Sequence, residues 1–279
     1  MTHRWEFRAM LPKTQTYQLD YSKIRPQAVF DQESRTRKAH TILSVLKNQF
    51  SSDLHDLTLL DIGCSTGIMA DALSPHLKKI VGIDIDTHAI QFARSTFRRP
   101  NLEFKLQDGL NLNFKDDTFD LVVCAHVYEH VPDAESLLSE VNRVLRPGGI
   151  CYFAAGNRLA VQEPHYGLPF LSYLPQGVAN AYLRCFRKGS IYYEKHRTVW
   201  GLRRLVRRFI VIDYTQRLIE TPALFGFDYL LKEGTRRQRL AKFALRHFYW
   251  LCPTYVWLLQ KEAPPEFIPS RSTANSISA

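Results

Sequence analysis

The sequence lacks several features that would assign it to a specialised class of protein. It has five cysteines, an odd number with no CxxC spacing, so neither a disulfide framework nor a cysteine-based zinc site is expected. No apolar run approaches the roughly 20 residues that span a bilayer, since the longest, residues 248–259, is short and contains Pro253. The first turns mix Arg4, Glu6 and Arg8 and lack the apolar centre of a secretory signal. We therefore expect a cytoplasmic protein.

The composition excludes further classes and divides the chain by charge. Of the 279 residues, 45% are hydrophobic and 23% are charged, which is ordinary for a globular protein and excludes a mostly disordered chain. The formal net charge is +10, but it is unevenly distributed. Residues 51–156 carry 15 acidic and 9 basic side chains, whereas residues 157–279 carry 8 and 19. The acidic middle and the basic final part indicate two different roles.

Hydrophobic patterning predicts an α/β fold. Short apolar runs alternate with helical segments, which is typical of parallel βαβ units covered on both faces. The runs are residues 57–62, 80–84, 102–106, 119–125 and 150–155, and the helical segments between them are residues 68–77, 88–97 and 133–145. Asp86 or Thr87 is placed to cap the second of these helices, and Asp133 the third. With further strands at 209–214 and 255–260, we predict a Rossmann-like, doubly wound, seven-stranded, mostly parallel sheet.

The same pattern divides the chain into five segments. These are an N-terminal helical segment (1–50), a Rossmann-like core (51–156), an aromatic and proline-rich insertion after strand five (157–197), the remainder of the sheet with basic helices (198–262) and a disordered tail (263–279). In this division the core would hold a nucleotide-like ligand. The insertion would then determine what else can enter the site.

Candidate ligand-binding residues follow the first three predicted strands. Leu59–Gly67 is a strand, a turn of small residues and a helix start, in which Gly63 and Gly67 let a ligand approach the backbone. The second strand ends at Asp84, whose carboxylate can accept hydrogen bonds from ribose hydroxyls. The third ends beside Asp108, which can accept from an adenine amine. For each residue alone, a structural turn or a capping or solvated aspartate is the alternative.

Five motifs resemble those of the class I S-adenosylmethionine-dependent methyltransferases. They are LLDIGCSTG, VGIDID, LQDG, FDLVVCAHVYEHV and VLRPGG, in this order and spacing. The likeness covers roughly residues 38–156 and is greatest to the small-molecule branch that includes ubiquinone-biosynthesis enzymes. The absent GxGxxG pattern disfavours the main rival, an oxidoreductase of the NAD type. The resemblance implies S-adenosyl-L-methionine as the cofactor.

The resemblance also implies which residues bind that cofactor, all at or near the carboxyl ends of the first four strands. They are Asp61, Gly63, Cys64, Ser65, Gly67, Asp84, Ile85, Gln107, Asp108, Gly109 and Ala125. Asp61 would lie near the methionine moiety, Asp84 at the ribose and Asp108 at the adenine. Ser65 stands where the family usually has the middle glycine.

The fourth strand leads into a segment with two histidines, His126 and His130. Methyl transfer needs an acceptor held near the methyl group and usually a base that removes the acceptor's proton, and imidazole titrates near neutral pH. We therefore expect His130 and His126 as the catalytic candidates, with His130 favoured for a role at the site. The alternative is structural, with the imidazole bonded to nearby backbone.

A metal site is a further alternative for this segment. His126, Glu129 and His130 are spaced i, i+3 and i+4, which places them on one face if the segment is helical. Some of the ubiquinone-type enzymes that the chain resembles carry Glu-x-x-Glu-His here and depend on a metal. This sequence has histidine in the first place, and His165 is the only candidate for a fourth ligand that we identify. We expect no bound metal.

The acceptor is expected to contact the insertion. Residues 163–175 are rich in aromatic residues and prolines and would emerge at the same sheet edge as the cofactor. An apolar lid there would exclude water and bind a hydrophobic acceptor, with His165 and Tyr166 as substrate-binding candidates. The alternative is a packed subdomain whose apolar side chains only form a small core.

Two basic groups follow the insertion, four arginines within residues 203–208 and five basic residues within 236–246. A solvated helix face is the ordinary explanation. The functional alternatives are contact with an anionic membrane surface or a lipid-linked diphosphate, and contact with a nucleic-acid backbone. Aromatic residues among 243–250 favour the membrane, and no recognisable RNA-binding module accompanies them.

These observations together predict a methyltransferase that acts on an oxygen of a small or lipid-linked acceptor, in the cytoplasm or peripheral to a membrane. An RNA methyltransferase that uses the basic C-terminal third is the first alternative, with nucleic acid the less favoured partner. A non-catalytic, cofactor-binding interaction module is the second.

Overall fold

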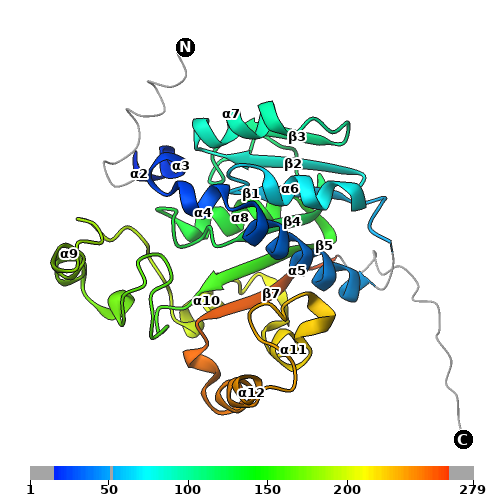
Figure 1. Cartoon of the computed structure of the whole chain (residues 1–279). Helices are drawn as coiled ribbons and strands as arrows, with labels where there is room; N and C mark the ends of the chain where they lie inside the picture. The colour runs from blue at the N-terminus through cyan, green and yellow to red at the C-terminus, as the bar shows by residue number, and fades with distance from the viewer. Residues whose placement is uncertain (1–15, 51–52, 264–279) are drawn as a thin grey trace, which may run out of the picture.

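The computed structural model describes residues 16–50 and 53–263, and this part of the chain contains a seven-stranded sheet (Figure 1). The strands are β1 (Thr58–Ile62), β2 (Lys79–Asp84), β3 (Leu102–Leu106), β4 (Phe119–Ala125), β5 (Leu145–Gly156), β6 (Phe209–Asp213) and β7 (Thr254–Lys261). Their order is β3-β2-β1-β4-β5-β7-β6, with β7 antiparallel to both of its neighbours. The predicted fold class is confirmed. The strand order runs outward from β1 to β3 and then resumes at β4 on the other side of β1. Open α/β sheets bind ligands at such a reversal of strand order.

The central strands are nearly continuous apolar runs because helices cover both faces of the sheet. In β1, Leu59, Leu60 and Ile62 are buried, and Leu60 pairs with Val81 of β2 and Val122 of β4. Burying one such side chain stabilises the fold by about 1.5–3 kcal/mol. The sheet is therefore a rigid support for the turns that follow its strands.

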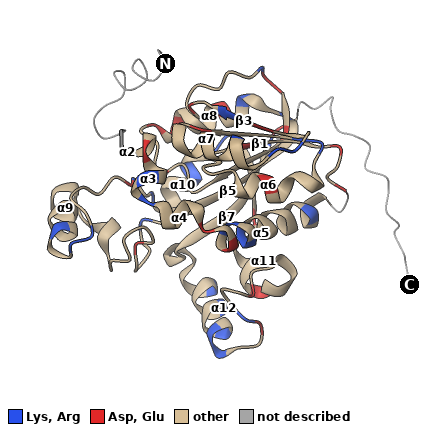
Figure 2. Ribbon diagram, turned by 45° about the horizontal axis from the view of Figure 1, so that its top comes forward, with Lys and Arg blue, Asp and Glu red and all other residues tan. Residues whose placement is uncertain are grey.

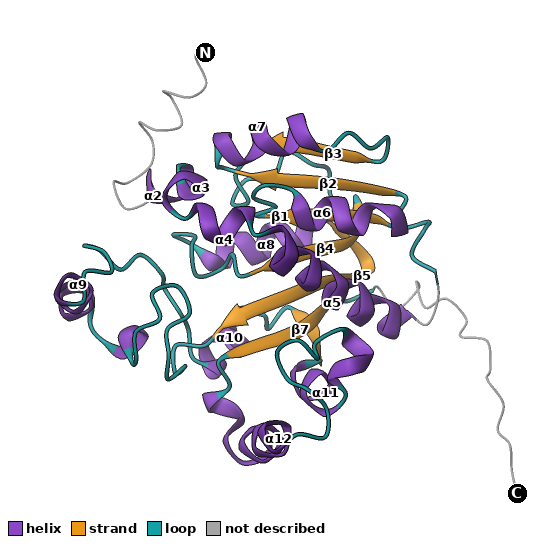
Figure 3. Ribbon diagram, viewed as in Figure 1, coloured by secondary structure: helices purple, strands orange, loops and turns teal. Residues whose placement is uncertain are grey.

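Helices form a layer on each face of this sheet (Figure 3). The described α-helices are α2 (Thr16–Leu19), α3 (Tyr21–Ile24), α4 (Pro26–Phe30), α5 (Gln32–Phe50), α6 (Ile68–Leu73), α7 (Thr87–Thr96), α8 (Ala134–Val144), α9 (Gln176–Cys185), α10 (Val199–Leu205), α11 (Thr215–Glu220) and α12 (Arg236–Phe248). Side chains of α5, α6, α7 and α11 enter the core on one face, and those of α8 and α10 the core on the other. The predicted caps are confirmed, since Asp86 and Asp133 accept backbone N–H groups at the starts of α7 and α8.

Local chemistry shifts two of the predicted boundaries. The helix expected over residues 68–77 is α-helical only to Leu73, because Pro75 lacks the N–H that would continue it and lies in the 3₁₀ turn η1 (Ser74–His76). The segment Arg146–Gly149, expected to lie between helix and strand, belongs to β5, which begins directly after α8. There the pairing of β5 with β4 shifts its register between Phe119 and Leu121.

The insertion after β5 contains η2 (Leu171–Tyr173) and α9 and has a small apolar core of its own. Figure 1 shows it on the side of the molecule toward which β5 points, where α2 and α3 also lie. A second addition lies between β6 and β7 and comprises α11, η3 (Pro222–Phe225), α12 and η4 (Tyr249–Leu251). Three parts of the chain therefore flank the carboxyl ends of the strands, where the site is predicted. They are the N-terminal helices, the insertion after β5 and the segment between β6 and β7.

Parts of the predicted division lie outside the described residues, namely 1–15 of the N-terminal segment and 264–279 of the expected tail. The five-segment division itself stays an interpretation. Among the helices of residues 16–50 and 53–263, none combines the length and the apolar character needed to cross a bilayer.

Candidate functional site

A cleft of about 1300 Å³ opens at the carboxyl ends of the central strands. Most of the predicted cofactor-binding residues line it, namely Gly63, Ser65, Asp84, Ile85, Gln107, Asp108, Gly109 and Ala125. The N-terminal helices form a second wall, with Arg25, Arg35 and Lys38 among its residues. The fold thus gathers residues from distant parts of the sequence around one cleft.

The turn after β1 depends on left-handed backbone. Gly63 and Gly67 have φ angles of 72° and 79°, and Ser65 adopts 52° as a non-glycine residue. A Cβ atom on Gly63 would lie 2.7 Å from a methyl group of Val127, so only glycine fits there. The side chain of Cys64 is buried in the apolar core, and neither Cys64 nor Gly67 lines the cleft. These two residues shape the turn rather than face the space in front of it.

Asp61 lies directly before this turn, and its carboxylate makes no hydrogen bond among the described residues. The side chain is fully buried. Burial raises the pKa of Asp61 to about 7, although the charge of Arg35 acts in the opposite direction. A buried carboxylate without a partner is suited to receive a cationic amino group. Asp61 itself does not line the cleft, but it directly precedes the turn that does, where the resemblance implies the methionine part of the cofactor.

Asp84 is the last residue of β2, and its carboxylate links the turn after β1 to the turn after β2. Its Oδ2 accepts a hydrogen bond from the Ser65 N–H at 2.8 Å, and its Oδ1 accepts one from the Asp86 N–H at 2.9 Å. Burial raises the pKa of Asp84 to about 6. Because each carboxylate oxygen has a second lone pair and Asp84 lines the cleft, it can also accept from a ligand diol.

The turn after β3 supplies polar groups for a planar ring. Asp108 Oδ1 accepts from the Leu110 N–H at 2.9 Å, which orders the turn locally. The amide Nε2 of Gln107 is buried and has no hydrogen-bond partner in the described part of the chain. An unused donor beside a carboxylate is compatible with the edge of an adenine, as the resemblance implies.

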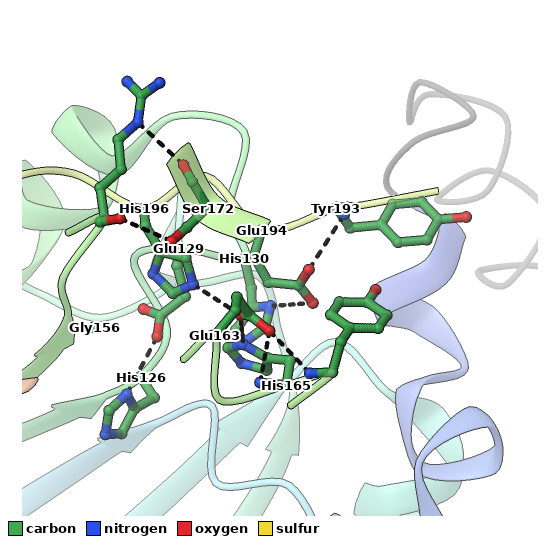
Figure 4. Close-up of polar contacts among 12 residues, drawn as sticks. His126, Glu129, His130, Gly156, Glu163, His165, Ser172, Tyr193, Glu194 and His196 are labelled. Carbon is green, nitrogen blue, oxygen red and sulfur yellow. Dashed lines mark hydrogen bonds and ion pairs between the residues drawn. The ribbon is translucent and has the colours of Figure 1, made fainter. Parts of the chain in front are cut away.

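His126 lies at the tip of β4 and faces the cleft. Its backbone is left-handed, with φ of 57°, and its N–H donates to the Ala154 carbonyl at 2.8 Å. The Nδ1 atom lies 3.2 Å from Oε1 of Glu129 (Figure 4), while the His126 side chain is 40% exposed. Burial would raise the pKa of Glu129, but the His126 hydrogen bond and nearby histidines hold it at about 2. This pair is a histidine oriented by a charged carboxylate.

His130 is in a different environment from His126. Its side chain is only 15% exposed, its Nδ1 lies 3.1 Å from Nε2 of Gln18, and its ring packs edge-on against that of His165. Burial lowers the pKa of His130 to about 3, so the imidazole is neutral at physiological pH. His130 lines the same cleft as His126, but its ring is more buried and is held by Gln18 and His165.

His126, Glu129 and His130 would share one face only in a helical segment, and the structure does not meet this condition. Residues 126–132 form turns rather than a helix, because His126 has left-handed backbone that starts no α-helix. His126 contacts Glu129, whereas His130 points toward the insertion. The i, i+3, i+4 spacing therefore does not collect these three side chains at one point, although the ligand atoms of Glu129 and His130 lie within 4.8 Å of that of His165.

The insertion instead contributes to a group that we call the histidine–carboxylate cluster (Figure 4). Its members are Glu129, His130, Glu163, His165, Glu194 and His196. Glu163 Oε1 lies 2.7 Å from His165 Nδ1 and 3.2 Å from His196 Nε2. His165 also lines the cleft, whereas Tyr166 packs in the insertion's own core and is absent from the cleft lining. Of the two predicted substrate contacts, only His165 reaches the site.

The cleft also has an apolar wall that the sequence analysis missed. It is formed by side chains from β5, β7, α11, α12 and the loops between them, including Tyr152, Leu218, Phe227, Ala241, Ala244, Leu245, Phe248 and Val256. Arg35, Gln18, Glu163, Glu194 and His196 were missed as well. The Glu163–His165 spacing was a usable signal for a local pair, but nothing in the pattern places His196 beside it.

Comparison with known proteins gives two kinds of sequence similarity. Residues 60–153 match the family model described as a methyltransferase domain. The chain is 26% identical over 130 residues to a ubiquinone biosynthesis O-methyltransferase of Colwellia psychrerythraea, covering 43% of this chain and 50% of that protein. It is 27% identical over 168 residues to the protein of that name from Serratia proteamaculans, covering 53% and 65%. The matched part is thus about half to two thirds of these relatives.

Similar solved structures support the fold. A phosphoethanolamine N-methyltransferase of Haemonchus contortus, in complex with S-adenosyl-L-methionine, matches with a TM-score of 0.56 at 16% identity over 91% of this chain and 61% of that chain. An S-adenosylmethionine-dependent methyltransferase from Mesorhizobium loti matches with a TM-score of 0.51 at 19% identity over 75% and 93%. At these identities the likeness concerns the fold alone.

Proposed function

Residues 60–153 form the core of a class I, S-adenosylmethionine-dependent methyltransferase domain, and from this premise we propose that the protein methylates an oxygen atom of a small or lipid-linked acceptor. One observation carries the proposal. The cleft joins the cofactor edge of the sheet to an apolar wall, and His126 bonds through its N–H to Ala154, the pairing partner of Val256 in that wall. The oxygen is favoured because the curated relatives described above are named as O-methyltransferases.

The strand-end residues would hold the cofactor. Asp61 would receive its amino group, Asp84 its ribose hydroxyls and Gln107 with Asp108 its adenine edge. Arg35 lines the same space and carries the charge that the cofactor's carboxylate needs. When bound, S-adenosyl-L-methionine supplies an electrophilic methyl group.

His126 would act as the general base. Its Nε2 would take the proton of the acceptor hydroxyl as that oxygen bonds to the methyl carbon, while the methyl–sulfur bond of the cofactor breaks and leaves S-adenosylhomocysteine. Glu129 accepts from Nδ1, which fixes the tautomer with Nε2 free and stabilises the imidazolium that results. His126 is more suitable than the initially favoured His130, whose ring is buried against Gln18 and His165. His130 would position the segment instead.

The apolar wall would hold the acceptor's hydrocarbon part. Its side chains come largely from α11, α12 and β7, and such apolar side chains would contact a hydrocarbon chain. A wall of Leu, Phe and Ala side chains is suited to an isoprenoid or acyl group rather than to a polynucleotide backbone. This favours a small or lipid-linked acceptor over RNA.

Helix α12 would bring the cleft to an anionic membrane surface. Ala241, Ala244 and Leu245 face the cleft, while Leu240 and Phe243 are 68% and 56% exposed. Basic side chains lie along the same helix (Figure 2), namely Arg236, Arg237, Arg239, Lys242 and Arg246. Exposed apolar residues among basic ones suit the headgroup region of a bilayer. A lipid-linked acceptor could then enter the cleft beside this helix.

The test of the activity uses methyl-labelled cofactor. The full chain is incubated with labelled S-adenosyl-L-methionine and a whole-cell extract, and the label is separated into lipid, RNA, protein and small-molecule fractions. We expect label in the lipid or small-molecule fraction as an alkali-stable ether, lost in the His126→Ala variant. Label in RNA would favour the RNA methyltransferase. Binding of cofactor without turnover in any fraction would favour the non-catalytic module.

The membrane part of the proposal has a separate test. Sedimentation with vesicles of phosphatidylglycerol should retain the protein at low salt, and vesicles of phosphatidylcholine should not. The double variant Leu240→Glu, Phe243→Glu should lose this binding. Val178→Glu is the matched control, because Val178 on α9 is also exposed, at 53%, and lies in another segment. Equal binding by all three proteins would refute a role for α12.

A further inference from the structure

The histidine–carboxylate cluster is only partly used by the proposed reaction. Its members come from the loop after β4, from the start of the insertion and from the segment just before α10. Figure 4 shows Glu163 at the centre, pointing toward both His165 and His196. Glu163 is fully buried and His196 is 9% exposed, so water screens neither of them well.

The donor atoms are already close enough to share one ion. The ligand atoms of Glu163, His165 and His196 all lie within 4.8 Å of one another. Zinc bound at roughly 2.0–2.2 Å to nitrogen and oxygen donors in a tetrahedron separates those donors by about 3.2–3.6 Å. Small side-chain rotations would therefore convert the observed contacts into a coordination shell.

Three polar atoms around this point lack a hydrogen-bond partner among the described residues. They are His196 Nδ1, Glu129 Oε2 and Glu194 Oε1, and all three are buried. Native proteins rarely leave such atoms unpaired, because their desolvation is not repaid. Three buried carboxylates next to imidazoles are the environment in which a divalent cation supplies the missing charge.

We propose that Glu163, His165 and His196 bind one divalent transition-metal ion of the zinc class. Two imidazoles and a carboxylate favour zinc, cobalt or iron(II) over magnesium, which prefers oxygen donors. Glu129 and Glu194 lie next to this set and are available as a further ligand or as partners of the ligating imidazoles. This site goes beyond the methyl-transfer proposal and shares only His165 with the residues considered from the sequence, namely 126, 129, 130 and 165.

The ion would fasten the two ends of the insertion to each other. Glu163 and His165 lie near its beginning, and His196 lies at its end, just before α10. The ring contact between His165 and His130 would then hold the insertion against the loop after β4. The expected role is structural, with the metal setting the position of this side of the cleft.

The test is a cobalt titration of the untagged full chain after removal of metals with a chelator. We expect a visible absorption band that saturates at one Co²⁺ per chain and disappears when Zn²⁺ is added. Glu163→Gln and His196→Ala should each weaken Co²⁺ binding at least tenfold. His88→Ala is the matched control, because His88 is an exposed histidine on α7 outside the cluster, and it should bind as the wild type does.

Two outcomes would overturn the site. One is the absence of a saturable band in the folded wild type, and the other is unchanged affinity in Glu163→Gln. Circular dichroism shows whether each variant is folded, and the wild-type stoichiometry decides the question if a variant is not. Zn²⁺ should also raise the Tm of the wild type by several degrees but not that of Glu163→Gln. No methyl donor is present, so failure here leaves the labelling test of the methyltransferase unaffected.

Discussion

The two sides of the cleft differ in how the chain builds them. Apart from Arg35 of α5, the cofactor side is made of short turns that directly follow β1, β2, β3 and β4, so most of its residues lie next to a recognisable strand. The acceptor side is made from the N-terminal helices, the insertion and α11 to β7, which meet only in space. The identity of the methyl donor can therefore be inferred from local motifs, whereas the choice of acceptor depends on packing between distant segments.

The largest expected effect tests the junction of the two sides. His126→Ala should lower kcat by about 10²–10⁴, because a positioned general base contributes that much to proton removal. Cofactor affinity, measured by calorimetry, should stay within about twofold of the wild type. His130→Gln should have the smaller effect on kcat. If His126→Ala kept full activity, the assignment of the base would be wrong.

A change confined to the cofactor side should strongly weaken binding of the methyl donor. In Asp84→Ala, two charge-assisted hydrogen bonds to a ribose are lost, which corresponds to about 3 kcal/mol or a roughly 100-fold weaker Kd. Equilibrium dialysis with S-adenosyl-L-methionine measures this change. Asp116→Ala, at an exposed aspartate away from the cleft, is the control and should bind normally. Normal binding by Asp84→Ala would contradict the proposed ribose contact.

The buried carboxylate of Asp61 should make both stability and cofactor affinity depend on pH. Because the pKa of Asp61 is raised to about 7, the folded protein without cofactor holds a proton that the unfolded chain loses near pH 4. Its free energy of unfolding should therefore fall as pH rises from about 4 to 7, by a few kcal/mol. Cofactor affinity should change in the opposite direction, rising about tenfold from pH 5.5 to 8, because the carboxylate pairs with the amino group.

The variant Asp61→Asn tests this explanation. It has nearly the same shape and no titrating group, so its free energy of unfolding should show a weaker pH slope in denaturant titrations. Its cofactor affinity should vary little between pH 5.5 and 8. A wild-type slope in this variant would assign the effect to another group.

The smallest expected effect lies on the acceptor side. Ala244→Phe adds a ring at the apolar wall and should raise KM for the acceptor about fivefold, since pocket volume discriminates by about 1–3 kcal/mol per group. Cofactor affinity should not change. Val178→Phe places the same side chain at an exposed position of α9 outside the cleft and is the control. Equal KM values would show that α12 does not contact the acceptor.

Much of the cofactor side was predictable because its signals are local. The strand patterns, the capping aspartates and the turns at Gly63 and Asp84 each depend on a few consecutive residues. The seventh strand was also predicted, although the antiparallel direction of β7 requires knowledge of which strands it joins. The segment after β4 was less predictable, since the left-handed backbone at His126 separates side chains that helical spacing would have gathered.

Hydrophobic period and turn chemistry act over short distances, so the α/β sheet, its ligand-binding edge and the resemblance to methyltransferases could be inferred before the structure. Only the tertiary structure decided that Tyr166 packs inside the insertion and that His165 reaches the cleft. It also decided that His196 lies against Glu163, and that α12 lines the acceptor wall. These contacts join residues far apart in the chain, and their geometry depends on how whole elements pack rather than on any local pattern.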